Sequence, residues 1–221
     1  MPDEALKLVV LGAGGTAADA LSIVDDLNSC RGQQYLVDAL LDDDAARHGT
    51  LLAGIRIAGS TRRAVDLEGT GLINTLGSPR NPAIRERITH DLGLARERFI
   101  SLIHPSVAVS RSARLGRGVI LYPNVVIMAN VTIGDQVIVL SGSVINHDCA
   151  IGDFVTIASG ANISGNVRIG QASYVGSGSA IIQNAMVGDH AIVGMGSVVL
   201  HDVAPGSVVA GNPAAPIRRT C

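Results

Sequence analysis

The residue pair with the clearest chemical capacity in this chain is His147 followed by Asp148, within the segment VINHDC that spans residues 144–149. A histidine whose pKa lies near neutrality takes a proton from an amine or a hydroxyl, and a neighbouring carboxylate orients its ring and raises its basicity. The pair therefore predicts a general base. The structural alternative is a histidine that merely lies exposed at a corner of the fold.

A second chemical feature is a glycine-rich segment, GAGGTA at residues 12–17, which follows an apolar run. It matches the pattern G-x-G-x-x-A, in which glycines let the backbone approach a phosphate at a helix N-terminus. Three aspartates at 42–44 end the next predicted strand, where such folds place a carboxylate for a ribose hydroxyl or a base. An ordinary tight turn and a solvated acidic turn are the alternatives. The predicted nucleotide-binding residues are Gly14, Gly15, Thr16, Asp42 and Asp43.

The first hundred residues predict a small parallel α/β domain that positions this glycine turn. Apolar runs predict strands at 8–11, 35–41, 71–76 and 99–103, and helices follow the glycine turn and occupy 63–67 and 81–92. Alternating strands and helices are typical of a parallel sheet, so we expect a Rossmann-like domain over residues 1–104. This length is short for a complete dinucleotide fold, which favours one nucleoside diphosphate over NAD.

The second half of the chain repeats every six residues, and this repeat positions His147. Aliphatic residues recur at that spacing from Val109 to Val199, and small or β-branched residues follow a second series offset by four. A further period of eighteen places a glycine after every third aliphatic residue from Ile133 onward. A helix needs a period of 3.6 and a flat strand a period of two, so neither explains a strict six.

A parallel β-helix with three flat faces in each coil accounts for both periods. The aliphatic residue of each hexad then points inward, and the small residues of the second series occupy a second inward position, which assigns Cys149 to the core. Gly165 follows His147 by eighteen residues and therefore lies in the next coil, about 4.8 Å away. Its backbone N–H is placed to stabilise an oxyanion. We assign residues 105–205 to this β-helix and 206–221 to a C-terminal tail.

Composition excludes several other classes of function. The net charge is -2 and aromatic residues make up 2% of the chain, so neither nucleic acid nor an anionic membrane is an expected partner. No apolar stretch approaches a membrane span, and Asp3 and Glu4 stand where a secretory signal carries basic residues. Three distant cysteines fit no zinc motif, so we expect a cytoplasmic protein with no metal site.

The union of these two halves resembles one known family. The opening VVLGAGG, the segment LLDDDAARHGTLLAGIRIAGS, the junction IHPSVAVSRSARLGRGV, the hexads and the closing VAPGSVVAGNPAAPIR are similar to the NeuD/PglD-like sugar O/N-acetyltransferases. The likeness covers nearly the whole chain. It implies a left-handed β-helix and a homotrimer with active sites between subunits, neither of which periodicity determines.

The resemblance also implies roles for individual residues. It makes His147 the base, assisted by Asp148, and gives Gly165 the oxyanion contact. Acetyl-CoA is the implied co-substrate, and Thr156 departs from the histidine that relatives carry at that position. The implied acetyl-CoA-binding residues are Thr156, Gly165, Ser177, Gly178, Gly194 and Met195.

We therefore predict an acetyl-CoA-dependent N-acetyltransferase for a nucleotide-linked amino sugar of the 4-amino-4,6-dideoxy type. O-acetylation of a sialic-acid-like sugar is the nearest alternative, because it changes only the acceptor. A nucleotide-sensing scaffold would need no His147–Asp148 pair, and an NAD-dependent reductase would need a longer first domain. The sequence does not distinguish UDP, GDP and dTDP as the nucleotide.

Overall fold

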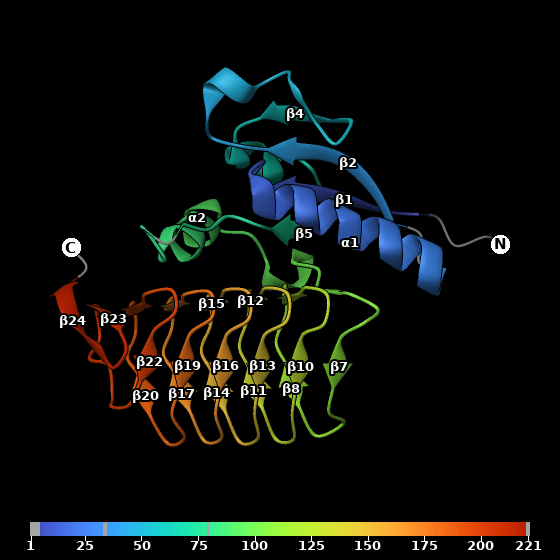
Figure 1. Ribbon diagram of the computed structural model, residues 1–221. Coiled ribbons are helices and arrows are strands. Elements are labelled where there is room, and N and C mark those ends of the chain that lie inside the picture. The colour runs from blue at the N-terminus through green and yellow to red at the C-terminus, as the bar shows by residue number, and fades with distance from the viewer. Residues whose placement is uncertain (1–4, 33–34, 79, 220–221) are drawn as a thin grey trace.

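The computed structural model describes residues 5–32, 35–78 and 80–219 and consists of an α/β region above a long coil of short strands (Figure 1). Asp3, Glu4 and Cys221 lie outside the described residues. No helix within the described ranges is long and apolar enough to cross a membrane.

The α/β region is built on one sheet whose strands follow the order β3-β4-β2-β1-β5. Alternate residues of β1 enter two separate cores, Leu8 and Val10 beneath helix α1 and Val9 and Leu11 on the opposite face. Residues 8–11 are buried on both faces of the sheet, which explains their continuous apolar run. The elements are β1 (Leu6–Leu11), α1 (Gly15–Arg31), β2 (Tyr35–Leu41), β3 (Leu51–Leu52), β4 (Ile55–Gly59), β5 (Gly71–Asn74) and α2 (Ile84–Leu92).

Three features of this region differ from the sequence expectations. The hairpin of β3 and β4 was not expected, although Ala53 and Gly54 both have positive φ as a tight hairpin turn requires. Helix α2 begins at Ile84, because residues 81–83 form a turn. Short 3₁₀ turns occupy Ala45–Arg47, Thr61–Val65 and Arg96–Arg98, and the second replaces the helix expected at 63–67.

The strand expected at 99–103 differs from the prediction in its length and in its partner. The segment 99–103 was predicted as the last strand of the first domain, yet only Leu102–Ile103 (β6) is a strand, and it pairs with β9 of the coil. Phe99 forms an isolated bridge to Leu72 in the α/β sheet. The chain therefore passes from one sheet to the other within five residues, and an apolar run does not reveal which sheet it pairs with.

The coil has three faces of parallel strands, as the hexads predict. Each aliphatic hexad residue from Leu121 to Val199 is buried, whereas Val109 at the open end is 37% exposed. Face 1 contains β6, β9 (Ile120–Leu121), β12 (Ile138–Val139), β15 (Thr156–Ile157), β18 (Tyr174–Val175) and β21 (Ile192–Val193). Face 2 contains β7 (Ala108–Val109), β10 (Val126–Ile127), β13 (Val144–Ile145), β16 (Asn162–Ile163), β19 (Ala180–Ile181) and β22 (Val198–Val199). Face 3 contains β8 (Arg114–Leu115), β11 (Thr132–Ile133), β14 (Ala150–Ile151), β17 (Arg168–Ile169) and β20 (Met186–Val187).

Glycines close the corners between faces 3 and 1, also as predicted. A Cβ at Gly152 would lie 2.8 Å from the backbone nitrogen of Gln171, and one at Gly170 would lie 2.5 Å from that of Asp189. Because these contacts are to backbone, no rotamer change relieves them. The eighteen-residue glycine series is thus a steric requirement of stacking one coil on the next.

The segment assigned as a tail continues the fold. Strand β23 (Ser207–Gly211) pairs parallel with β21 on face 1, and β24 (Ala214–Arg219) then returns antiparallel beside it. A hairpin therefore ends this face of the coil.

The α/β region rests on face 1 (Figure 1). Ile120, Tyr122 and Ile138 of this face share a core cluster with α1 and β1. The Tyr122 hydroxyl donates to the Thr16 carbonyl at 2.8 Å, and His104 Nε2 lies 3.0 Å from an Asp26 carboxylate oxygen. The start of α1 is therefore fixed directly onto the coil.

Candidate active site

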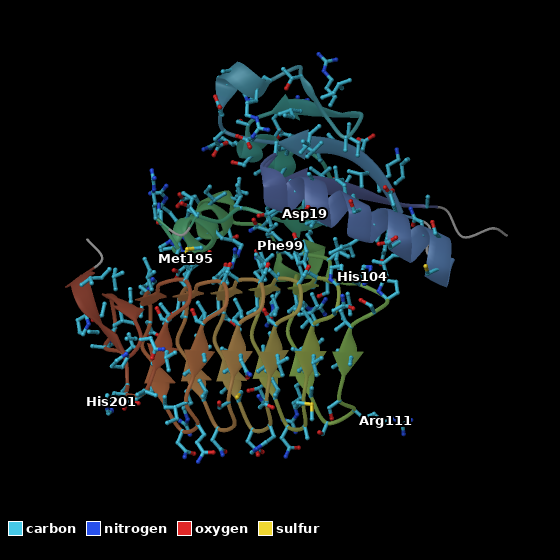
Figure 2. All side chains as sticks on the ribbon, in the orientation of Figure 1. Asp19, Phe99, His104, Arg111, Met195 and His201 are labelled. Atoms are coloured by element: carbon cyan, nitrogen blue, oxygen red, sulfur yellow. The ribbon has the colours of Figure 1, made fainter. Side chains whose placement is uncertain are left out.

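His147 lies in the turn that connects β13 on face 2 to β14 on face 3. Arg111 and His201 occupy the same turn position in an earlier and a later coil, and Figure 2 shows both at the side of the coil away from the α/β region. This edge is opposite face 1, on which the α/β region rests. His147 therefore faces away from the glycine turn of its own chain.

The predicted His147–Asp148 interaction is present. His147 Nδ1 lies 2.8 Å from Asp148 Oδ2, and the two side chains are 60% and 44% exposed. Because a carboxylate only accepts, Nδ1 carries the proton in the neutral ring and Nε2 keeps its lone pair. Hydrogen bonds from Asn130 and then from His147 hold the pKa of Asp148 below its usual value. The pair thus offers Nε2 as an exposed base with an ionised partner.

Gly165 lies directly against the imidazole ring, as the eighteen-residue spacing predicts. A Cβ at this position would lie 2.6 Å from His147 Cε1 and 2.7 Å from Nε2, so only glycine fits here without moving the base. Among the described residues no acceptor is bonded to the Gly165 backbone N–H. A free donor therefore stands beside the base, where an oxyanion would need it.

The glycine turn begins helix α1 as predicted. Gly14 is the N-cap residue, without a side-chain cap, and Gly15 is the first helical residue. A Cβ at either glycine would meet nothing within 4 Å, so open space lies above the turn. Helix N-termini carry unpaired N–H groups and a partial positive charge, which attract phosphate.

The two predicted aspartates hold this turn in shape. Asp42 Oδ2 accepts from the Ala13 backbone nitrogen at 2.8 Å, and Asp43 Oδ1 accepts from both the nitrogen and the hydroxyl of Thr61 at 2.9 and 2.8 Å. Arg47 also donates to the Ala13 carbonyl and lies 3.6 Å from Asp42. These acids are committed to the protein's own groups, which gives them a structural role beside the one predicted.

The predicted acetyl-CoA-binding residues occupy a different edge from the base. Ser177 and Gly178 follow β18 and Gly194 and Met195 follow β21, in the turns from face 1 to face 2. Met195 is 77% exposed. Within one chain the structure therefore does not bring these four residues to His147 and Gly165.

Thr156 lies apart from that group, beneath the α/β region. Its hydroxyl accepts from Arg85 Nη2 at 3.0 Å. It lines a pocket of about 90 Å³ together with Thr16 of the glycine turn. Ser78, Arg85 and Tyr174 add polar groups to the same lining. One residue from each of two predicted sets, the nucleotide turn and the acetyl-CoA contacts, thus lines a single pocket.

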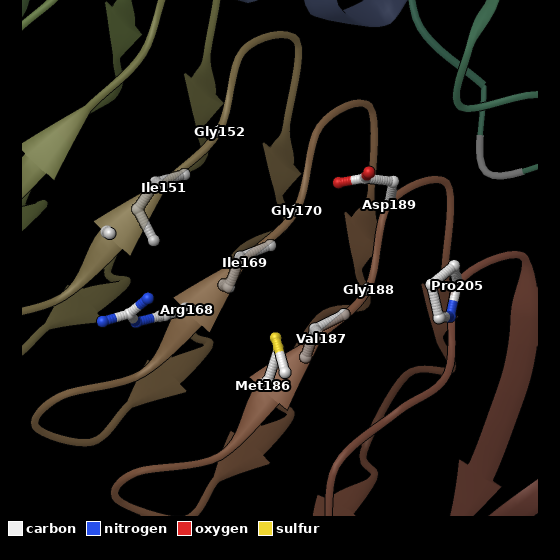
Figure 3. A pocket seen from close by; sticks show the side chains of 11 residues that line it. Ile151, Gly152, Arg168, Ile169, Gly170, Met186, Val187, Gly188, Asp189 and Pro205 are labelled. Atoms are coloured by element: carbon white, nitrogen blue, oxygen red, sulfur yellow. The ribbon is translucent and has the colours of Figure 1, made fainter.

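A second, larger pocket lies on face 3, about 380 Å³ in volume (Figure 3). Arg168 and Met186 stand at neighbouring strands along it, and Ala150, two residues after Asp148, belongs to its lining. Its open, mostly apolar floor is formed by the strand ends and corner glycines of three successive coils. It adjoins the edge that carries the base.

Comparisons with known proteins show the family of this chain. The family model described as "Bacterial transferase hexapeptide (six repeats)" matches residues 112–147 and 130–165. The acetyltransferase domain of PglB from Neisseria gonorrhoeae FA1090, solved in complex with acetyl coenzyme A, is 33% identical with a TM-score of 0.84 over 97% of this chain and 100% of that one. This chain belongs to the hexapeptide-repeat acetyltransferase family.

Two further relatives are similar to this acetyltransferase. PerB from Caulobacter crescentus, solved in complex with CoA and GDP-perosamine, is 28% identical with a TM-score of 0.81 over 96% of this chain and 97% of that one. UDP-N-acetylbacillosamine N-acetyltransferase of Bacillus subtilis (strain 168) is 44% identical over 41 residues, which are 19% of each protein. That sequence match therefore spans about a fifth of the curated relative.

The buried cysteine of the acetyltransferase is part of the coil core. Cys149 is buried in the coil core, its thiol donates to the Ser164 carbonyl at 3.0 Å, and burial raises its pKa. A protonated inward thiol does not suit a covalent acyl-enzyme. The residues that the structure describes contain no cluster of metal-ligating side chains.

Sequence reasoning missed two residues of the acetyltransferase that contact its candidate sites. Arg85, which the sequence does not single out, is fully buried, and Asn130, which donates to Asp148, was not considered. For Asn130 the signal was available, because it precedes Asp148 by one coil of eighteen residues. For Arg85 no repeat or motif indicated burial.

Proposed function

We propose that this acetyltransferase transfers the acetyl group of acetyl-CoA to the amine of a nucleotide-linked amino sugar of the 4-amino-4,6-dideoxy type. The observation that carries the proposal is the pocket that Thr16 and Thr156 share. It would bring a sugar held at the glycine turn beside a thioester held by the coil. Two of the relatives support this class of acceptor, since one is named for UDP-N-acetylbacillosamine and another was solved with GDP-perosamine.

The nucleotide is held by the α/β region. The open turn at Gly14 and Gly15 and the N–H groups at the start of α1 suit a diphosphate. The four parallel strands of this region, β4, β2, β1 and β5, support a site for one nucleoside diphosphate.

The acetyl-CoA site lies at the edge between faces 1 and 2. Met195 projects into solvent there, and a Cβ at Gly178 would meet nothing within 4 Å, so the turns leave an open ledge for a long flexible ligand. Thr156 lies apart from this ledge, in the pocket that it shares with Thr16, and the thioester would have to reach that pocket to meet the sugar.

The base is supplied by a second copy of the chain. His147 lies on the edge opposite the α/β region of its own chain, so it reaches this pocket only across a subunit interface. A left-handed coil packed as a homotrimer would place the edge between faces 2 and 3 of one subunit against the edge between faces 1 and 2 of the next. Each subunit would then contribute to two active sites.

The reaction requires three groups of this chain. The sugar nitrogen attacks the acetyl carbon while His147 Nε2 takes the proton that the nitrogen loses. The Gly165 N–H stabilises the oxyanion of the tetrahedral intermediate. When the carbon–sulfur bond breaks, the imidazolium returns the proton to the thiolate. Asp148 stabilises the ring while it carries the positive charge.

The test is an acetyl-CoA thiol-release assay against UDP-, GDP- and dTDP-linked 4-amino-4,6-dideoxy sugars, with sialic acid as the oxygen acceptor. We expect turnover on one amino-sugar nucleotide, with the product identified as the amide by mass spectrometry. A reaction without acceptor corrects for thioester hydrolysis. Turnover on sialic acid alone would move the acceptor to oxygen, and no turnover with any acceptor would overturn the proposal.

A further inference from the structure

The Asp148 carboxylate has a second partner in the preceding coil. Asn130, in the turn after β10, donates from Nδ2 to Asp148 Oδ1 at 3.0 Å, while Asp148 Oδ2 faces His147 at 2.8 Å. The three side chains thus form one line, in which the amide holds one carboxylate oxygen and the imidazole holds the other.

This contact does not follow from the repeat alone. The same turn position recurs at Ser112, Asn130, Asp148, Asn166, Asn184 and Asp202. Among the described residues of this column, the Ser112 hydroxyl accepts from the Asn130 backbone nitrogen, and a hydrogen bond between two side chains of neighbouring coils joins only Asn130 and Asp148. Asn184 has the same backbone geometry, with φ of 65° against 59° for Asn130, and no such bond. The turn therefore forms without it.

We propose that Asn130 is a positioning residue for acetyl transfer, which fixes the Asp148 carboxylate in the orientation that holds His147 Nδ1–H. The expected effect on kcat rests on the proposed function. The expected effect on the orientation of Asp148 and His147 rests on geometry alone.

The physical need for such a residue comes from exposure. Asp148 is 44% exposed, so its carboxylate would otherwise rotate and exchange His147 for water. A hydrogen bond to a charged acceptor is stronger than one to a neutral acceptor. The neutral amide of Asn130 can therefore hold the carboxylate without neutralising the charge that interacts with His147. The titratable group that faces this carboxylate is the His147 imidazole, and the carboxylate also acts electrostatically on the inward Cys149 thiol.

The clean variant is Asn130→Gly, because glycine keeps the positive φ of the turn and removes only the amide. Asn184→Gly is its matched control, since it makes the same change in the same column away from Asp148. We expect Asn130→Gly to lower kcat about tenfold relative to Asn184→Gly, with the KM for acetyl-CoA and the Tm equal in the two variants. Equal kcat values would overturn the proposal.

Asn130→Asp separates positioning from turn packing. Aspartate also tolerates positive φ and has the same shape, but it places an acceptor against Asp148. We expect a loss of kcat at least as large as that of Asn130→Gly. Wild-type kcat in this variant would show that only the shape of Asn130 matters.

A readout that needs no turnover keeps this inference separate from the proposed function. Nitrogen NMR of the His147 ring, assigned by its loss in His147→Ala, reports which nitrogen carries the proton in the neutral state. We expect the Nδ1–H form in the wild type and in Asn184→Gly, and a mixed population in Asn130→Gly. An unchanged Nδ1–H population in Asn130→Gly would overturn the positioning role even if no acceptor sugar had been found.

Discussion

The coil and the α/β region are held in place by different kinds of contact. Every strand of the coil pairs with its equivalent in the next coil, and the same inward position is filled by an aliphatic residue each time. The α/β region instead meets face 1 through one shared apolar cluster and a few single polar side chains, among them Arg85 and Tyr122. The coil is thus held by many equivalent contacts, whereas the docking of the α/β region depends on individual residues.

The two regions also carry different parts of the proposed active site. The base lies on the coil edge away from the α/β region, and the nucleotide turn lies where the two regions meet. Substitutions at the base should therefore lower kcat without changing the stability of the fold. Substitutions where the regions meet should lower the stability. The predictions below test this division, from the largest expected effect to the smallest.

His147→Ala should separate chemistry from folding most clearly. We expect kcat to fall by about 10²–10⁴-fold, the usual contribution of a general base. The side chain is 60% exposed, so the Tm and the affinity for the nucleotide sugar should not change. The measurements are steady-state kinetics, thermal unfolding and calorimetric binding. A kcat near that of the wild type would exclude His147 as the base.

Arg85→Met should instead break the docking of the α/β region. The guanidinium donates to the carbonyls of Gln136 and Leu76 at 3.0 and 2.8 Å and to the Phe154 carbonyl at 2.6 Å, so it joins α2 to the coil. Burial lowers its pKa to about 10, which still leaves it charged at neutral pH. Removing it leaves buried carbonyls without this donor, and we expect a loss of about 3 kcal/mol in the free energy of unfolding.

Arg87→Met is the control for that loss, because Arg87 is an exposed arginine on the same helix. Urea denaturation of both variants gives the comparison. Equal stability of the two variants would show that the apolar cluster alone holds the α/β region on the coil.

Gly165→Ala tests whether the base and the coil are as independent as the comparison suggests. The added Cβ would lie 2.6 Å from His147 Cε1, so the ring must move. His147 and Gln183 hold the same turn position in the neighbouring coils with a Cβ, so the turn itself accepts one. We expect kcat to fall by about tenfold or more and stability to fall by about 1 kcal/mol.

The double variant His147→Ala with Gly165→Ala gives the deciding measurement. Removing the ring removes the clash, so the double variant should regain the stability that Gly165→Ala loses. Additive losses of stability would place the strain in the backbone of the turn rather than against His147.

The same contrast explains which contacts could be predicted from the sequence alone. Strict hexads fix which residues face inward and which lie one coil apart, so the predicted meeting of His147, Asp148 and Gly165 needed no knowledge of the other region. The α/β region has no repeat, and its contacts join residues far apart in the chain. Arg85 and the carbonyl of Phe154 are an example, because no local pattern predicts that these two meet.

The strand expected at 99–103 was assigned to the wrong sheet for a related reason. The apolar residues at 99–103 suit either sheet, and only the pairing of β6 with β9 assigns them to the coil. The eighteen-residue period predicts where the turns between faces lie, including the turn that contains Asn130. It does not predict their side-chain bonds, because the period gives spacing and not orientation.

Tyr122→Phe should give the smallest effect and the sharpest test of single-residue docking. Burial raises the pKa of Tyr122, so its hydroxyl stays protonated and donates to the Thr16 carbonyl at 2.8 Å. Phenylalanine keeps the ring in the apolar cluster and removes only this bond, so we expect a loss of about 1 kcal/mol in the free energy of unfolding.

Tyr174→Phe is the matched control for Tyr122→Phe. Tyr174 also lies on face 1 and is half-buried, but its hydroxyl has no hydrogen-bond partner among the described residues. Its stability should stay within about 0.5 kcal/mol of the wild type. Because Thr16 is the first residue after the two open glycines, losing its anchor should also loosen the nucleotide turn and raise the KM for the nucleotide sugar more than that for acetyl-CoA. Equal changes in both KM values would mean that the Tyr122 hydroxyl stabilises the junction between the regions without shaping the turn.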